Sequence, residues 1–215
     1  MKLPRHSPSR AGFTQMDLWI VVAIVVILCA FVGTSLVNAQ RKARRIRCIS
    51  YLKQIGQGSR IYATDHGDVF SQRLTTNKGG SLEYVGLGQS WRHFSAMSNE
   101  LGNPIVLTCQ MDIRQVVRNW WQFGSSNLSY FISLDASEGN AQAILSGDRD
   151  IETELPPTNG ILVLVTNRPV RWTGQIHCGS GNYGLADGSV RQADTAFLQS
   201  QVNANRDATN RIELP

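Results

Sequence analysis

The segment Ala11-Gly12-Phe13-Thr14-Gln15-Met16-Asp17-Leu18 and the apolar run behind it, which ends near Val37, decide the fold that we expect. No charged residue lies between Leu18 and Gln40. A helix over that stretch is about 35 Å long at roughly 1.5 Å per residue, and the hydrocarbon core of a bilayer is about 30 Å thick. The sequence therefore predicts one membrane-spanning helix.

The position of the small residues distinguishes this segment from a secretory signal peptide. A signal peptide has an apolar core of about 7–15 residues and a small-residue cleavage site after it. Here the small pair Ala11-Gly12 precedes the apolar run. Cleavage at that pair leaves the helix attached to the rest of the chain.

A short basic leader that ends in Gly12, followed by Phe13-Thr14-Gln15-Met16-Asp17-Leu18 and an apolar helix, resembles the signal of type IV prepilins and type II secretion pseudopilins. The resemblance implies that a prepilin peptidase cuts after Gly12 and N-methylates Phe13. It also implies that Asp17, where the family usually has Glu, meets the N-terminal amine of a neighbouring subunit. A carboxylate one turn into a helix also interacts favourably with the helix dipole. The simpler alternative is an acid that flanks a signal anchor at the lipid headgroups.

A second resemblance lies near the C-terminus. His177, nine intervening residues and then Asp187-Gly188 resemble the H-X9-DG element of a bacterial group of prepilin-processed proteins. We expect His177 and Asp187 to form a hydrogen-bonded pair, with a metal site or a plain turn residue at Asp187 as the alternatives. The Asp187-Gly188 dipeptide is also the strongest hairpin signal in the chain, because type I′ turns need positive φ at both central positions.

The rest of the chain completes an α+β pattern. The helix is expected to continue as a stalk to about residue 64, and strand-like runs follow at residues 105–109, 129–134 and 161–166, with a final helix over residues 195–202. A long helix must bury its apolar face on the sheet. We therefore expect a pilin-like fold, in which a long N-terminal transmembrane plus stalk helix packs on a small antiparallel β-sheet. The expected parts are a leader (1–12), that helix (13–64) and an exported globular domain (65–215).

The charge distribution bears on partners and location. Three of the 21 basic residues lie before Phe13, so the processed chain carries 18 basic and 16 acidic residues, and nucleic acid is not an expected partner. The basic cluster at residues 41–47 is typical of contact with the headgroups of inner-membrane lipids. Counting positive charges places the large domain in the cytosol, whereas the resemblance implies that it is exported. Following the resemblance, we expect a single-pass protein of the bacterial inner membrane with its C-terminal domain periplasmic or in an extracytoplasmic filament.

Four cysteines constrain the redox state. Cys29 lies in the apolar run, and sequence alone leaves the pairing of Cys48, Cys109 and Cys178 open. Because Cys48 lies on the expected stalk and Cys109 ends a strand expected to pack on it, we predict that these two are bridged. No Cys-x-x-Cys pair or EF-hand spacing is present, so no metal or cofactor is expected.

These patterns favour a structural role over catalysis. No Ser-His-Asp spacing, Gly-x-Ser-x-Gly elbow or phosphate-binding loop is present, so no enzymatic activity is expected. The resemblance implies a pseudopilin-like subunit that assembles with other pilin or pseudopilin subunits into a homo- or hetero-oligomeric filament of a type II secretion or type IV pilus system. The alternative is an exported binding protein that uses the prepilin pathway only for sorting. Its carbohydrate or surface ligand would then stack on tryptophans, namely Trp91, Trp120, Trp121 and Trp172.

Overall fold

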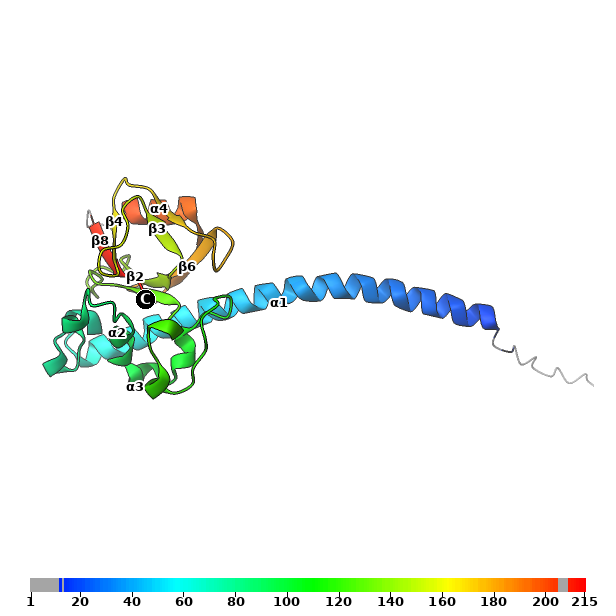
Figure 1. Ribbon diagram of the computed structural model, residues 1–215, viewed down its shortest axis with the longest axis horizontal. Coiled ribbons are helices and arrows are strands. Elements are labelled where there is room, and N and C mark those ends of the chain that lie inside the picture. The colour runs from blue at the N-terminus through cyan, green and yellow to red at the C-terminus, as the bar shows by residue number, and fades with distance from the viewer. Residues whose placement is uncertain (1–11, 13, 205–208) are drawn as a thin grey trace, which may run out of the picture. The chain divides into compact units, whose positions relative to one another are not determined.

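The computed structural model describes Gly12, residues 14–204 and residues 209–215, without the side chains of residues 31–35 and 37. The chain divides into two compact units, Met1–Ala43 and Arg44–Pro215. Helix α1 (Gln15–Asp65) contributes residues to both units (Figure 1). The second unit therefore takes in the last part of the helix together with the whole sheet.

The described part of the chain contains α1, three shorter helices, eight strands and six single-turn 3-10 helices. The shorter helices are α2 (Trp91–Ser95), α3 (Ser98–Leu101) and α4 (Thr195–Ala204). The strands are β1 (Tyr130–Ser133), β2 (Ile144–Asp148), β3 (Ile151–Thr153), β4 (Ile161–Val165), β5 (Val170–Trp172), β6 (Ser180–Leu185), β7 (Val190–Asp194) and β8 (Thr209–Glu213).

Helix α1 begins and ends where its sequence supplies caps. Thr14 and Asp17 form a capping box, because the Thr14 backbone N–H donates to Asp17 Oδ2 (3.0 Å) and the Asp17 N–H donates to Thr14 Oγ1 (3.3 Å). At the other end Gly67 adopts a left-handed conformation with φ of 69°. The Asp68 N–H then donates to Ala63 O at 2.8 Å, which closes the last turn as expected for a helix followed by glycine.

The expectation of a membrane-spanning segment is wrong. Among the described residues, no helix is both long and apolar enough to cross a membrane. Spanning needs a helix of about 20 consecutive, predominantly apolar residues. The expected transmembrane plus stalk helix is therefore corrected to one helix, α1, without a membrane-spanning part among the described residues. The same finding contradicts the expected single-pass location in the inner membrane.

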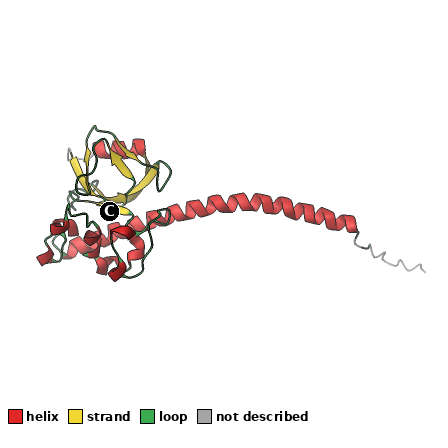
Figure 2. Cartoon of the chain, viewed as in Figure 1, coloured by secondary structure: helices red, strands yellow, loops and turns green. Residues whose placement is uncertain are grey.

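The sheet is larger than expected and entirely antiparallel. Six strands lie in the order β4-β8-β1-β2-β6-β7, and β3 pairs with β5 in a separate two-stranded ribbon. Figure 2 shows the strands gathered on one side of the second unit together with α4, and α2 and α3 on the other side. The last strand of the chain, β8, lies between β4 and β1, so the sheet is completed by residues at the end of the sequence.

Both faces of the central strands are buried. Along β1, Tyr130 and Ile132 pack into a core with the last part of α1, while Phe131 packs into a second core on the opposite face, in the two-residue alternation of a strand. Gly147 lies opposite Phe131 in β2, and a Cβ there would come within 2.8 Å of the phenyl ring. Glycine at this position lets the aromatic ring lie flat on the neighbouring strand.

The local predictions had mixed outcomes. Strands β1 and β4, the β6–β7 hairpin and helix α4 lie where they were expected. The strand expected at residues 105–109 is wrong, because Pro104–Leu107 form the 3-10 helix η4. The Asn103 side chain accepts from the Ile105 N–H (3.0 Å), and Pro104 starts the turn, so the segment has helix-start chemistry despite its β-branched residues.

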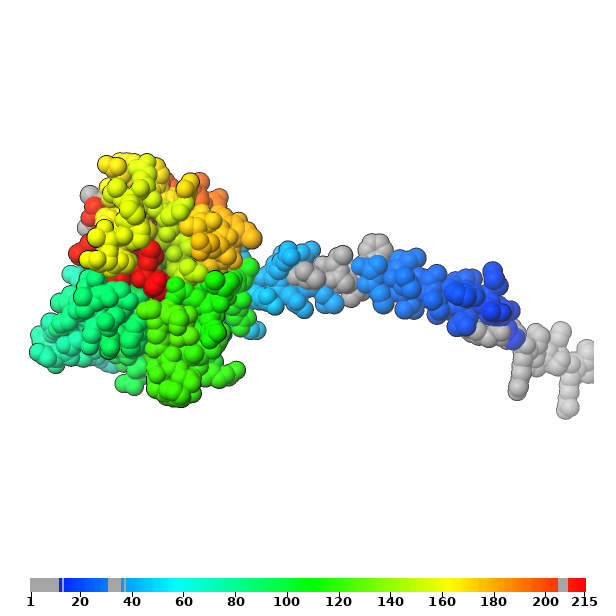
Figure 3. Space-filling view, in the orientation of Figure 1, coloured from blue at the N-terminus to red at the C-terminus, as the bar shows by residue number. Residues whose placement is uncertain are grey.

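The C-terminal residues connect two parts of the second unit by hydrogen bonds. Figure 3 shows them (red) between the yellow β3–β4 region and the green segment that precedes β1. The Leu214 N–H donates to Gly160 O (2.7 Å), and Arg114 donates to Pro215 O (3.3 Å). Two segments distant in sequence are thus joined through the last residues.

Candidate functional site

The expected hydrogen-bonded pair of His177 and Asp187 does not form. His177 lies in the loop before β6 and is only 3% exposed, whereas Asp187 is exposed in the turn after that strand. A strand of six residues spans about 20 Å, so the two side chains lie at its opposite ends. Asp187 Oδ1 instead accepts from the Ser189 N–H (2.8 Å). Asp187 is therefore a turn residue, which was one of the alternatives considered from the sequence.

The turn itself differs from the expected type I′ geometry. Of the two central residues, only Gly188 has a positive φ, at 84°. The Gly188 N–H donates to Leu185 O (2.9 Å), and the Leu185 N–H donates to Ser189 O (2.8 Å). This is a three-residue connection with a glycine bulge, the next most common way to close a hairpin.

His177 instead contacts groups from three other segments. Its Nε2 lies 3.0 Å from Asn182 Nδ2, 3.3 Å from Asp148 Oδ2 and 3.6 Å from Cys109 Sγ. Asp148 Oδ2 in turn accepts from the Asn182 backbone N–H (2.7 Å) and from its side-chain amide (2.9 Å). Neighbouring strands β2 and β6 supply Asp148 and Asn182, and the sheet register is what brings them together.

Burial dominates the electrostatics of this cluster. It raises the pKa of Asp148 well above its usual value, although hydrogen bonds from Asn182 oppose the shift. Burial, with the nearby positive charge of Arg45, lowers the pKa of His177 to about 4. The imidazole is therefore neutral near pH 7. Asp148 Oδ1 and His177 Nδ1 have no hydrogen-bond partner among the described residues.

A disulfide lies directly beside this histidine. Cys48, on α1, and Cys109, just after η4, are joined, with their Cα atoms 5.3 Å apart and 61 positions apart in sequence. Both are fully buried in the core that α1 forms with the short helices and β1. The bridge fixes α1 to the segment after η4. It was predicted for a strand at residues 105–109, and this segment forms a 3-10 helix instead.

One end of the H-X9-DG element binds α1 beside the disulfide. Ser180 Oγ donates to His177 O (2.8 Å) and accepts from the Arg45 guanidinium (2.6 Å). Arg45 lies one turn before Cys48 on the helix. The loop that carries His177 is therefore held to α1 by a hydrogen bond as well as by packing on the disulfide.

The other end binds α1 two to three turns later. A Cβ on Gly56 would lie 3.2 Å from Gly188 Cα, so backbone packs on backbone at this point. The Arg60 guanidinium also donates to Asp187 O (3.0 Å). From residue 45 to residue 60 a helix rises about 22 Å, close to the length of a six-residue strand with its flanking loops. The spacing of the element thus matches a segment of helix, and we call this arrangement, from Arg45–Ser180 to Gly56–Gly188, the helix clamp.

The charged side chains of residues 148–150 do not act as one group, because Arg149 and Asp150 make separate contacts. Arg149 forms a two-pronged ion pair with Asp112, with both N···O distances 2.8 Å. Burial would raise the pKa of Asp112, but hydrogen bonds from Arg149 and Ser129 hold it below its usual value. Asp150 Oδ2 accepts from the Ile176 N–H (3.1 Å), which positions the loop that carries His177.

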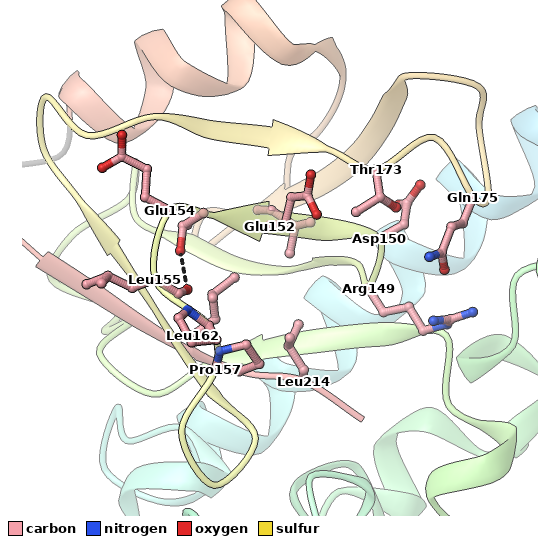
Figure 4. A pocket seen from close by; sticks show the side chains of 13 residues that line it. Arg149, Asp150, Glu152, Glu154, Leu155, Pro157, Leu162, Thr173, Gln175 and Leu214 are labelled. Atoms are coloured by element: carbon pink, nitrogen blue, oxygen red, sulfur yellow. Dashed lines mark hydrogen bonds between the residues drawn. The ribbon is translucent and has the colours of Figure 1, made fainter.

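An open pocket of about 440 Å³ lies over β3 and the loop that follows it. Figure 4 shows Glu152 and Glu154 along one side, with Arg149 pointing away from them. Glu152 pairs with Arg171, and Glu154 lies 3.5 Å from Arg168, so both acids already have cationic partners. Apolar side chains complete the lining, including Leu155, Pro157, Leu162 and Leu214.

A second buried constellation was not expected from the sequence. His93 Nδ1 lies 2.8 Å from Ser81 Oγ, and its Nε2 lies 3.0 Å from Glu213 Oε2. Ser81 donates its only proton to Ser71 O, so His93 Nδ1 must donate to Ser81. The order Ser-His-Glu is that of a nucleophilic triad, but Ser81 is 1% exposed and no substrate reaches it. The group joins β8 to α2 and the loop before it.

The remaining predicted site residues lie in the first unit. Gly12 is exposed, with no atom within 4 Å of a Cβ built on it, and Phe13 lies outside the described residues. Asp17 is exposed, and hydrogen bonds from Thr14 lower its pKa. The cleavage site and the contact of Asp17 with a neighbouring amine stay predictions. Cys29, like Cys178 in the second unit, is a free and exposed thiol.

The tryptophans do not form one platform for a ligand. Trp172 is 4% exposed in the core of the sheet. Trp91 and Trp120 pack edge-on against Phe123, and of these four tryptophans only Trp121, at 79%, is largely exposed. The stacking site that a carbohydrate-binding protein would use is therefore not assembled from these residues.

No protein-family model, curated sequence or solved structure matches this chain. The His177 cluster combines a neutral imidazole, a buried carboxylate and a disulfide, and its direct consequence is to hold α1 against the sheet.

Proposed function

We propose that this chain is a pseudopilin-like structural subunit, cut between Gly12 and Phe13 by a prepilin peptidase and assembled through α1 with other copies or related subunits into a filament. The observation that carries the proposal is the exposure of the apolar part of α1. The eleven large apolar residues between positions 16 and 28 are 45–70% exposed, and they point to all sides of the helix. A helix that is apolar on all sides is typical of one that is buried.

The arrangement calls for several neighbours rather than one. A helix that docks on a single partner needs one apolar stripe, whereas this stretch is apolar all round. Burying each large side chain contributes about 1.5–3 kcal/mol. Packing among several equivalent helices buries every side at once, which a bundle in the core of a filament achieves.

The helix clamp supports the same role. The disulfide and the two ends of the clamp attach the last part of α1 to the sheet within the second unit. A subunit added to a filament through its helix must carry its globular body in a fixed position. The buried contacts at Cys48 and Gly56 make the helix segment and the body one rigid piece.

Processing and assembly are tested together in a bacterial host that co-expresses a prepilin peptidase. Mass spectrometry of the mature chain should show a start at Phe13 with one added methyl group. Mild shear followed by sedimentation and electron microscopy should yield filaments. Gly12→Leu should remain uncut and stay out of the sedimenting fraction.

The outcomes separate the proposal from its alternative. A chain that is processed at Phe13 but never sediments as a polymer would favour the exported binding protein. A mature N-terminus elsewhere, or normal processing of Gly12→Leu, would overturn the assignment of the cleavage site. Asp17→Asn, compared with Asp17→Glu, tests the expected contact with a neighbouring amine, because only the second variant keeps the negative charge.

A further inference from the structure

The sulfur atoms of the disulfide and the ring nitrogen of His177 form a group of metal-ligand type. Cys48 Sγ, Cys109 Sγ and His177 Nε2 all lie within 4.8 Å of one another, and all three residues are buried. Thiolate and imidazole are the usual ligands of structural zinc, with bonds of about 2.3 and 2.0 Å. Two such ligands on a tetrahedral ion lie about 3.5 Å apart, and His177 Nε2 lies 3.6 Å from Cys109 Sγ.

Asp148 does not belong to the group within 4.8 Å, but it lies beside the imidazole and offers a fourth ligand, a carboxyl oxygen. Its Oδ2 lies 3.3 Å from His177 Nε2 and accepts two hydrogen bonds from Asn182, whereas its Oδ1 has no partner among the described residues. The side chain is fully buried, and an unpartnered buried oxygen is costly. A cation between the two sulfurs and the imidazole would lie beside this carboxylate.

The surrounding charge suits a divalent ion. Two thiolates and one carboxylate carry three negative charges, so a divalent cation leaves one in excess. Arg45 lies close enough to influence the pKa values of both Asp148 and His177. Its guanidinium is held at Ser180 (2.6 Å), where it offsets the remaining negative charge.

We propose that the reduced chain binds one zinc ion through Cys48, Cys109, His177 and Asp148. Zinc binding and the Cys48–Cys109 disulfide exclude each other, because both use the same two sulfur atoms. In a chain that has not yet folded, a dithiol reductant transfers two electrons and two protons to the disulfide, which becomes two thiols while the reductant becomes a cyclic disulfide. Zinc then binds as each thiol releases its proton. Oxidation by a disulfide-bearing oxidant reforms the sulfur–sulfur bond, passes two electrons to that oxidant and releases the ion.

Zinc would bind to the chain before the disulfide has formed. Both sulfurs are fully buried in the folded chain, so a reductant does not reach the finished disulfide. In a newly made reduced chain, zinc would join α1 to the segment after η4 across 61 residues of sequence, as the disulfide does later. Structural zinc supplies folding free energy directly. The helix clamp would then form around either crosslink.

The experiment uses the full-length chain with Cys29→Ser and Cys178→Ser, which removes the two free thiols. The protein is made under reducing conditions, purified in mild detergent because of the exposed apolar part of α1, and titrated with Co²⁺ as a spectroscopic probe and then with Zn²⁺. We expect one equivalent of Co²⁺, with thiolate-to-cobalt charge-transfer bands and the intense visible bands of tetrahedral cobalt. The oxidised protein should show neither.

Variants test the individual ligands. His177→Ala and Asp148→Asn should each weaken Co²⁺ binding at least about tenfold, and His177→Ala should change the visible spectrum, whereas Asp187→Ala should leave both unchanged. Circular dichroism of the oxidised forms reports whether each variant folds. The proposal is overturned if the reduced chain binds no Co²⁺, or if His177→Ala binds it with the same affinity and spectrum as the parent.

Discussion

Removing the disulfide tests how strongly α1 is attached to the body of the second unit. In the double variant Cys48→Ala/Cys109→Ala, the unfolded chain regains the freedom that a crosslink over 61 residues removes. The chain-entropy relation gives about 14 cal/mol/K for a loop of that length, or about 4 kcal/mol at 25 °C. The voids left by two fully buried sulfur atoms add to this loss. Domains are typically stable by about 5–15 kcal/mol, so the variant should be marginal.

The measurement is urea unfolding of the full-length oxidised chain in mild detergent, followed by tryptophan fluorescence, since Trp172 and Trp91 report on the two sides of the sheet. The double variant should lose about 4 kcal/mol of unfolding free energy. Wild-type protein should resist reduction in native buffer and become reducible only as urea opens the core, because neither sulfur is exposed.

A matched control replaces the two free thiols. Cys29→Ala/Cys178→Ala removes exposed groups and should change the unfolding free energy by no more than about 0.5 kcal/mol. The reasoning fails if the Cys48 and Cys109 pair can be removed at a loss below about 1 kcal/mol. It also fails if reductant opens the bridge rapidly without denaturant, since the sulfurs would then be accessible.

Three further results are expected. The pKa of His177 is lowered to about 4 by burial, so this residue contributes stability that is present above about pH 6.5 and lost as the pH falls toward 4. Between pH 7.5 and 4.5, the unfolding free energy of His177→Gln should therefore fall by about 2–3 kcal/mol less than that of the wild type in urea titrations. Parallel pH profiles of the two proteins would contradict this. Gly181→Ala would place a Cβ 2.5 Å from the Trp172 ring and should cost about 1–3 kcal/mol in thermal melts, whereas Gly124→Ala, with no atom within 4 Å, should be nearly neutral; equal effects would refute the packing argument. Because His177 and Asp187 do not touch, the double variant His177→Gln/Asp187→Ala should be additive within about 0.5 kcal/mol, and a larger coupling energy would indicate a direct pair.

Features encoded by neighbouring residues were predictable from the sequence. The Asp187-Gly188 dipeptide marked the β6–β7 hairpin, and the end of the helix expected at about residue 64 agrees with the end of α1 at Asp65. The turn type was missed because a single positive φ at Gly188 is enough for a three-residue connection. At residues 105–109, β-branched composition favoured a strand, but Asn103 and Pro104 together start a 3-10 turn.

The His177 cluster could not be derived from spacing alone. Its partners Asp148 and Asn182 lie 34 residues apart in sequence and meet only through the register of β2 on β6. The expected partner, Asp187, failed for a reason that the sequence did contain, since residues 180–185 are a strand and hold the two side chains apart. The buried group of Ser81, His93 and Glu213 depends on contacts between residues up to 120 positions apart, and no local signal reports such contacts.

The membrane expectation rested on the length of the apolar run that ends near Val37. Among the described residues, however, no helix is both long and apolar enough to cross a membrane. What the structure shows over residues 16–28 is an apolar helix surface whose large side chains are exposed.

The place of β8 between β4 and β1 has a consequence for the order in which the chain can mature. During synthesis or transport, β4 and β1 emerge at least 44 residues before Thr209, and until β8 arrives each presents an open edge where the sheet will later be continuous. Open edges of apolar strands pair readily with other chains. The segment Thr209–Glu213 therefore completes the sheet last, and a chain halted before it would carry two unpaired strand edges and leave His93 Nε2 without its hydrogen-bond partner, Glu213.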